Sequence, residues 1–99
     1  MASKPCYMIV LGAFTDYPAF MAGYQVAVAP LIARFGGEYV LVGSDLQVLE
    51  GNFPGGGGAV VSRWPDRAAA LAFWNSAHYA DVKQLRAGTG SFQVVLIDA

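Results

Sequence analysis

The chain has 99 residues, of which 56 % are hydrophobic and 13 % charged, and its formal net charge is −1 at pH 7. This length predicts one domain over residues 1–99 and excludes two, because compact domains cluster near about 100–150 residues. The charged share is about half of the roughly 25 % that ordinary globular domains carry. A small domain exposes much surface for its volume, so we expect part of the hydrophobic surface to face a partner or an apolar ligand.

Charge and residue usage exclude several classes of function. The balance of 6 Lys and Arg against 7 Asp and Glu provides no basic field, so no nucleic-acid partner is expected. The apolar runs are far shorter than the roughly 20 residues of a membrane helix, and residues 1–5 lack the pattern of a secretory signal. These features predict a cytoplasmic protein without membrane contact. With Cys6 and His78 as the single cysteine and histidine, no disulfide, metal site or cofactor is predicted.

The first part of the chain predicts a strand followed by a helix. Residues 6–12 are rich in β-formers and end at a glycine, which is typical of a strand with both faces covered. Asp16 and Pro18 mark a helix start, and apolar residues then recur at spacings of three and four. Pro30 falls inside this pattern and lacks the N–H of an interior helical residue. We therefore expect a kink or a break near residues 27–29.

The middle of the chain predicts strands joined by glycine-rich turns. Residues 38–43 predict the second strand, and residues 47–51 predict a shorter strand or an extension of it. Residues 52–58 contain four consecutive glycines and predict a flexible loop rather than a phosphate-binding loop, because a strand at residues 59–64 follows instead of a helix.

The last part predicts two helical pieces and a final strand. Residues 66–74 predict one helix, Ser76 caps the next, and residues 92–97 predict the last strand. The order strand, helix, strand, strand, helix, strand predicts an α+β ferredoxin-like fold, with both helices on one face of a four-stranded antiparallel sheet. The strands do not alternate polar and apolar residues, so the other face needs a cover. We expect that cover to be the same sheet of a second subunit.

One group of polar residues is concentrated near the second helix. His78 has an unperturbed pKa close to neutrality, which makes it the candidate proton carrier of any reaction near pH 7. Ser76 and Tyr79 lie beside it in the sequence, as do Phe73 and Trp74. The alternative interpretation of His78 is a surface or helix-capping histidine.

Two arginines and one tyrosine are further candidates. Arg63 sits in an otherwise apolar strand, where it pairs with Glu50 in a structural ion pair or anchors a ligand. Arg86 lies near a helix end, where it stabilises the helix dipole or holds an enolate or carboxylate. Tyr24 falls on the apolar stripe of the first helix, either as a core residue or as a hydroxyl donor in a cavity.

Several short motifs carry a resemblance to a known family. The sequences Arg-Phe-Gly-Gly-Glu-Tyr at 34–39, Leu-Glu-Gly at 49–51, Trp-Pro-Asp-Arg-Ala-Ala at 64–69 and Trp-Asn-Ser at 74–76 resemble the uncharacterised DUF1330 family. That family belongs to the dimeric α/β-barrel superfamily, with antibiotic-biosynthesis monooxygenases, muconolactone isomerases and EthD-like proteins as relatives. The resemblance implies a homodimer whose two sheets face each other, with a cleft between sheet and helices in each subunit. Its recurrent polar positions correspond here to Tyr24, Glu50, Ser76, Tyr79 and Arg86.

The function hypothesis is a homodimer that binds a small apolar or aromatic molecule in this cleft, with or without activity as a cofactor-independent monooxygenase or isomerase. In the catalytic version, His78 carries the proton. The expected ligand-binding residues are Tyr24, Glu50, Arg63, Trp74, Ser76, Tyr79 and Arg86. The alternative hypothesis is a dimeric binding or scaffold module without chemistry, in which the same residues only maintain the dimer and the helix ends.

Overall fold

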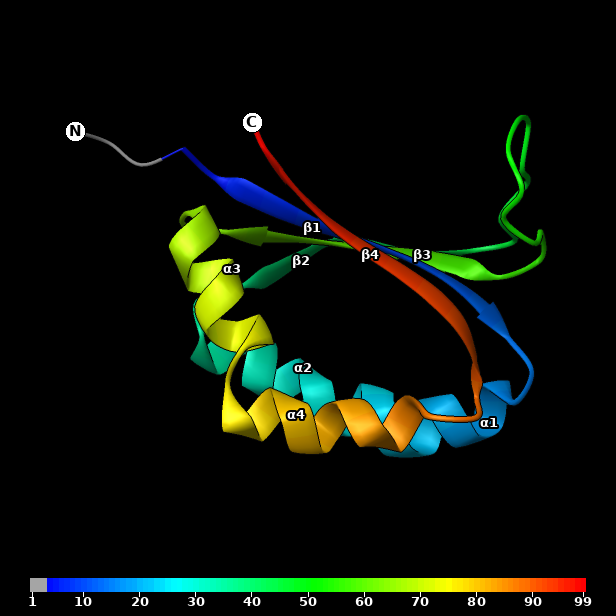
Figure 1. Cartoon of the computed structure of the whole chain (residues 1–99), viewed down its shortest axis with the longest axis horizontal. Helices are drawn as coiled ribbons and strands as arrows, with labels where there is room; N and C mark the ends of the chain where they lie inside the picture. Colours follow the sequence, from blue (N-terminus) through cyan, green and yellow to red (C-terminus); the bar gives the residue numbers. More distant parts are fainter. Residues whose placement is uncertain (1–3) are drawn as a thin grey trace.

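A computed structural model describes residues 4–99 and shows a four-stranded antiparallel sheet that carries its helices on one face (Figure 1). The strands lie side by side in the order β2-β3-β1-β4 and are β1 Cys6–Phe14, β2 Glu38–Ser44, β3 Gly58–Trp64 and β4 Gly90–Asp98. The helical segments are α1 Tyr17–Phe20, η1 Met21–Gln25, α2 Val26–Arg34, α3 Arg67–Trp74, α4 Ala77–Lys83 and η2 Gln84–Arg86. This arrangement is the ferredoxin-like α+β fold, so the predicted fold class is confirmed.

The first helical stretch begins where the sequence predicts. The carboxylate of Asp16 accepts a hydrogen bond from the backbone N–H of Ala19 at 3.1 Å. Pro18 lies in the first turn, where its missing N–H costs nothing. The stretch then passes through η1, which is a π-helix, before it continues as α2.

Of the kink or break predicted near residues 27–29, the break is wrong, because α2 runs without interruption through Pro30. Val26 and Pro30 both lie on the exposed side of α2. Water can therefore bond the Val26 carbonyl that Pro30 leaves unpaired. The irregular turn lies earlier, at η1.

Residues 45–57 form a loop, so the short strand predicted at 47–51 is also wrong. The pairing of β2 with β3 ends at Ser44 opposite Gly58, and residues 47–51 face no partner strand. The backbone of Leu46 closes the base of the loop through hydrogen bonds with Gly56 and Gly57 of 2.9 and 3.0 Å. In Figure 1 this loop, drawn in green, rises from the sheet on the side away from the helices.

The core lies between the inner face of the sheet and the helices. Cys6 and Met8 of β1 and Trp64 of β3 point inward and are buried. The Trp64 ring packs on Phe73 of α3, with centroids 5.0 Å apart, and its indole N–H donates to the hydroxyl of Ser62 at 3.0 Å. Cys6 is fully buried in this core, and burial raises the pKa of its thiol.

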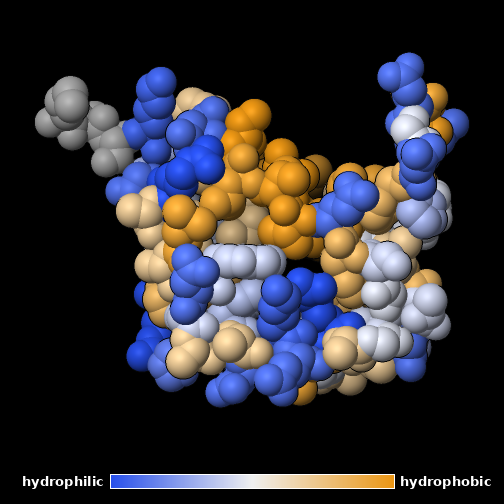
Figure 2. All heavy atoms as spheres, viewed as in Figure 1, coloured by the Kyte–Doolittle hydropathy of each residue, from blue (hydrophilic) through white to orange (hydrophobic). Residues whose placement is uncertain are grey.

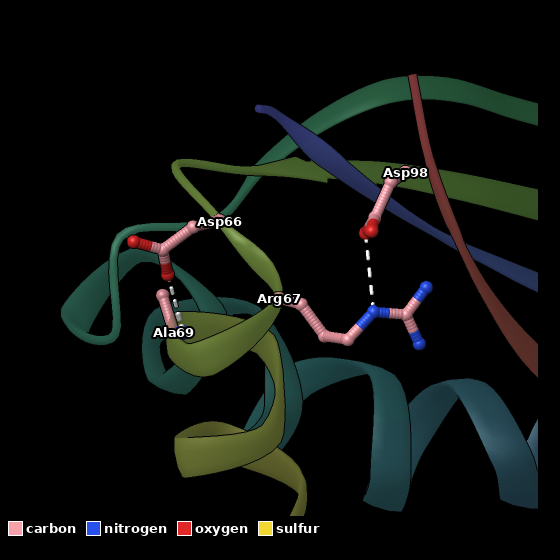
Figure 3. A network of polar contacts seen from close by, with 4 residues as sticks. All are labelled: Asp66, Arg67, Ala69 and Asp98. Carbon is pink, nitrogen blue, oxygen red and sulfur yellow. Dashed lines mark hydrogen bonds and ion pairs between the residues drawn. The ribbon is translucent and has the colours of Figure 1, made fainter. Parts of the chain in front are cut away.

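One polar contact caps the start of α3, and a second joins α3 to the sheet (Figure 3). The carboxylate of Asp66 accepts a hydrogen bond from the backbone N–H of Ala69 at 2.8 Å and so caps the start of α3. The next residue, Arg67, points to β4 and pairs its Nε with the Asp98 carboxylate at 3.1 Å. Within residues 4–99 this is the one ion pair between side chains.

The outer face of the sheet is apolar and uncovered. The strand register places Ile9 of the central strand between Val61 and Val95. Leu41 and Ile97 extend this surface over the edge strands, and they and Val95 are 53–54 % exposed. Among residues 4–99, no helix has the length and apolar character needed to cross a membrane.

Candidate functional site

The start of α4 sets the direction of the residues that follow it. The hydroxyl of Ser76 accepts a hydrogen bond from the backbone N–H of Tyr79 at 3.0 Å and donates one to the carbonyl of Phe73 at 2.8 Å. This N-cap fixes the first turn of α4 so that the Tyr79 side chain points to the sheet and is only 2 % exposed. Ser76 therefore has a structural role that positions Tyr79.

Tyr79 of α4 contacts Tyr24 of η1. Their hydroxyl oxygens lie 2.9 Å apart, and either hydroxyl can donate. Tyr24 belongs to the π-helical turn η1, and such turns are frequent at functional sites. Burial is the main cause that raises the pKa of Tyr24 far above its ordinary value, and the neighbouring Tyr79 adds to it. The Tyr24 hydroxyl therefore stays protonated and acts as a hydrogen-bond donor.

Arg86 adds a cation to this pair. Its guanidinium carbon lies 4.7 Å from the ring centroid of Phe92 and 5.7 Å from that of Tyr24. The Arg86 side chain is partly buried, yet among residues 4–99 it has neither a hydrogen-bond partner nor a carboxylate within 4.0 Å. Its backbone carbonyl is held by Thr89, whose hydroxyl donates to it at 2.6 Å. The backbone is thus fixed while the guanidinium donors remain available.

The layer between sheet and helices is open beside this cluster. On the inner face of central strand β1, Met8 is buried but Val10 is only partly buried. Val94 and Leu96 of β4 face the same layer and are also partly buried. Val10, Val94 and Leu96 pack against the core, yet none of them is fully buried. Figure 2 shows the corresponding hollow, with hydrophobic surface over the strands above it and hydrophilic side chains below it.

We call this hollow the Tyr–Arg cleft and define it by the residues that border it. They share an inward position and partial or complete burial, and they are Val10, Tyr24, Trp74, Tyr79, Arg86, Phe92 and Val94. Phe92 stacks on Phe20 with ring centroids 5.5 Å apart, which closes one end of the cleft. Trp74 packs on Tyr79 at 5.1 Å toward the other end. The cleft therefore combines aromatic walls with two hydroxyls and one cation.

Four of the sequence candidates are not among the residues that define this cleft: Ser76, which caps α4, and His78, Arg63 and Glu50. His78 is exposed and lines a groove of about 390 Å³ between α2 and α4, together with Arg34 and Asp81. Neighbouring residues on a helix point about 100° apart, so His78 faces outward because Tyr79 faces inward. The structure thus separates His78 from both tyrosines.

Arg63 lies on the opposite face of the sheet from the cleft, and Glu50 lines a different pocket that has Phe92 in common with the cleft. Arg63 is exposed on the outer face of the sheet, because side chains alternate along β3 and Ser62 and Trp64 point inward. Its neighbours across the strands are Tyr7 and Glu38, and it forms no ion pair with Glu50. Glu50 is exposed in loop 45–57, beside a second pocket of about 490 Å³.

Two residues of the site were missed in the sequence. Phe92 lies on the same side of its strand as Val94, and this two-residue alternation was the signal that could have found it. Lys83 places its amine 4.5 Å from the Trp74 ring centroid. Its position four residues after Tyr79 puts it on the same helix face, and this spacing is readable from the sequence.

The sequence matches the model of one protein family, described as a domain of unknown function (DUF1330), over residues 5–99. The chain belongs to the DUF1330 family. No curated protein matches it. The Tyr–Arg cleft is therefore a candidate site in a family described as a domain of unknown function.

Solved structures resemble this DUF1330 protein in fold. A protein of unknown function from Rhodopseudomonas palustris is 19 % identical, with a TM-score of 0.79 over 98 % of this chain and 83 % of that one. SnoaB, a cofactor-independent oxygenase from Streptomyces nogalater, is 13 % identical, with a TM-score of 0.70 over 98 % and 94 %. A dimeric protein of unknown function and ferredoxin-like fold from Bacteroides fragilis is 14 % identical, with a TM-score of 0.62 over 96 % of both chains.

Proposed function

We propose that this DUF1330 protein is a homodimer that binds a small apolar or aromatic anion in the Tyr–Arg cleft. The observation that carries the proposal is Arg86, whose guanidinium is held over two aromatic rings beside a hydroxyl pair and has no carboxylate partner within residues 4–99. A partly buried cation gains most from a charged acceptor. An anionic oxygen of the ligand would supply that acceptor, while its apolar body lies on Val10 and Val94.

Binding can be tested with 2-naphthoate, which joins an aromatic body to one carboxylate. We expect it to quench tryptophan fluorescence, because Trp74 borders the cleft. The variant Arg86→Gln removes the cation and should weaken binding at least about tenfold, the loss of one charge-assisted hydrogen bond. The matched control Arg34→Gln removes an exposed cation from α2 and should leave the affinity unchanged. Equal affinities of the two variants would contradict the assignment of the site.

The homodimer is supported by the uncovered apolar face of the sheet. Val95 and Ile97 are about half exposed in one chain, and exposed apolar surface of this kind is typical of interfaces. Val95→Lys should therefore yield a monomer in sedimentation experiments. Val26→Lys changes the same residue type on the helical side, where Val26 is 69 % exposed, and should leave the dimer intact. A monomeric mass of the unaltered chain at micromolar concentration would contradict the proposal.

A catalytic version of the same site is favoured by the hydroxyl pair next to Arg86. A cofactor-independent monooxygenase or isomerase begins with proton loss from the ligand, and Arg86 would hold the resulting enolate. The hydroxyl that does not donate within the Tyr24–Tyr79 pair can donate a hydrogen bond to its oxygen. Tyrosine, lysine and arginine border the cleft, and none of these accepts a proton readily at pH 7. His78 lies in the outer groove, so this version suits a ligand acidic enough to ionise in water.

Catalysis and simple binding differ in what happens to the ligand. A monooxygenase without cofactor converts a ligand methylene to a carbonyl and releases the second oxygen atom as water, so oxygen consumption reports it. Native mass spectrometry of freshly purified protein identifies a retained molecule to use in this assay. Oxygen consumption or a shifted double bond supports the enzyme, whereas return of the unchanged ligand supports a binding module.

A further inference from the structure

A second cation borders the Tyr–Arg cleft. The Lys83 amine lies 4.5 Å from the ring centroid of Trp74. Tyr79, Lys83 and Arg86 follow one another at spacings of four and three residues, so they share one face of α4 and η2. Tyr79 is buried and Arg86 is partly buried toward the sheet, whereas Lys83 lies exposed at the rim of this face. The other polar residues of α4, His78 and Asp81, line the outer groove instead.

The aromatic rings of the cleft form a row with a cation at each end. Trp74 and Tyr79 have ring centroids 5.1 Å apart, and Tyr79 and Tyr24 have centroids 6.4 Å apart. Lys83 lies over the first ring of the row, and Arg86 lies over the last. Ring contacts therefore connect the two positive charges, from Lys83 through Trp74, Tyr79 and Tyr24 to Arg86.

Neither cation of the row is neutralised within residues 4–99, where Arg67 and Asp98 form the one ion pair. Acidic residues outnumber basic residues in the chain, 7 to 6, so unpaired cations do not result from a shortage of carboxylates. Like charges three residues apart on a helix repel each other. A ligand with two negative charges would remove the repulsion between Lys83 and Arg86 and would stabilise both cations beside the aromatic rings.

We propose that the ligand of the cleft is a planar aromatic dianion, with one anionic oxygen group at each end of its ring system. This inference rests on the proposed function and adds the substrate class: an aromatic dicarboxylate, or an aromatic carboxylate with an ionised hydroxyl at its far end. One acidic group binds Arg86 and the tyrosine hydroxyls, and the other binds Lys83 at the open end. A ligand with a single charge leaves Lys83 unused.

Two probes with the same ring system test the substrate class. Naphthalene-2,6-dicarboxylate carries a carboxylate at each end, and 2-naphthoate carries one. We expect the unaltered protein to bind the dicarboxylate about tenfold more tightly at low salt, with a smaller preference at high salt because Lys83 is exposed. Equal binding of both probes would overturn the dianion and leave the proposed function intact. Failure of both probes to bind would overturn the proposed function together with the dianion.

Lys83 variants assign the preference to one residue. Lys83→Gln should weaken binding of the dicarboxylate more than binding of 2-naphthoate and so remove the preference, and Lys83→Arg should keep the preference because it keeps the charge. Arg86→Gln should weaken binding of both probes. Lys4→Gln is the matched control, since Lys4 is an exposed lysine outside the cleft, and should change nothing. A Lys83→Gln protein that still prefers the dicarboxylate would overturn the proposal.

Discussion

The inner face of the sheet is sealed at one end and open at the other. At the α3 end, Trp64 and Phe73 are each 1 % exposed, and Arg67 is neutralised by Asp98. At the η2 end, Val10 stays partly exposed, and Arg86 lies over aromatic rings without a carboxylate among residues 4–99. Both ends are built from aromatic side chains and one arginine.

The difference lies in what completes each end. The sealed end is complete within one chain, because its polar groups are paired and its rings fill the space between the layers. The open end has paired its two tyrosine hydroxyls with each other but leaves a cation and apolar surface for another molecule. Aromatic content alone therefore does not distinguish a core from a site. A partly buried cation over aromatic rings without a carboxylate partner is the feature that differs between the two ends.

The largest effect should come from emptying the sealed end. Phe73→Ala removes a fully buried ring that contacts Trp64 and should lower the free energy of unfolding by about 3–5 kcal/mol. Phe92→Ala at the open end should lower the free energy of unfolding by clearly less, because Phe92 is only partly buried. Urea unfolding of both variants measures the difference. Equal losses would mean that the open end is packed as tightly as the core.

The tyrosine pair should have the next largest effect. Tyr79→Phe removes one hydroxyl of a bonded pair and should lower the free energy of unfolding by about 1–3 kcal/mol, because Tyr24 loses its partner in a partly buried place. The double variant with Tyr24→Phe should lose less than the sum of the single variants. Tyr17→Phe is the control, since Tyr17 is 53 % exposed. Additive losses would contradict the coupling of the two hydroxyls.

Alkaline pH should weaken the open end. Burial raises the pKa of Tyr24 in the folded chain, so above pH 10 the unfolded chain gives up this proton first and the folded chain binds more protons. The stabilisation is complete below about pH 10 and falls by about 1 kcal/mol between pH 10 and pH 11. Unfolding curves of the unaltered chain and Tyr24→Phe measure the difference. A parallel decline of both proteins would contradict the shifted pKa.

The sequence predicted the architecture well because the fold depends on patterns that neighbouring residues share. Strand runs, helix caps at Asp16, Asp66 and Ser76, and glycine stops all act locally, and the structure confirms the caps at these positions. The predicted strand at 47–51 failed because a strand needs a partner, and pairing is set by the register of distant residues. The predicted break before Pro30 failed because this side of α2 is exposed. Water can bond the Val26 carbonyl there, so the hydrogen bond that Pro30 cannot donate costs little free energy.

The site was predicted only in part, for a related reason. Tyr24, Tyr79, Trp74 and Arg86 come together as the sequence hypothesis expects, because each lies on an inward face of its element. His78 and Arg63 have suitable chemistry but lie on outward faces. Which face points inward depends on the cap and the strand register. A shift by one residue reverses the face of a strand and turns a helical side chain by about 100°. Residue type alone therefore cannot place a side chain in a cleft.

The smallest effect on stability, and the sharpest contrast between the two ends, should come from the arginines. Arg67→Gln breaks an ion pair whose side chains are 47 % and 44 % exposed, so it should cost less than about 1 kcal/mol, and salt should reduce the cost. Added 2-naphthoate should raise the melting temperature of Arg67→Gln as much as that of the unaltered chain, because the ligand binds the folded state at the other end. Arg86→Gln should lose this ligand-induced rise. Arg67 is paired at the surface of the opposite end of the sheet and has no role in holding the ligand. Loss of the ligand-induced rise in Arg67→Gln as well would therefore show that the two ends are not independent.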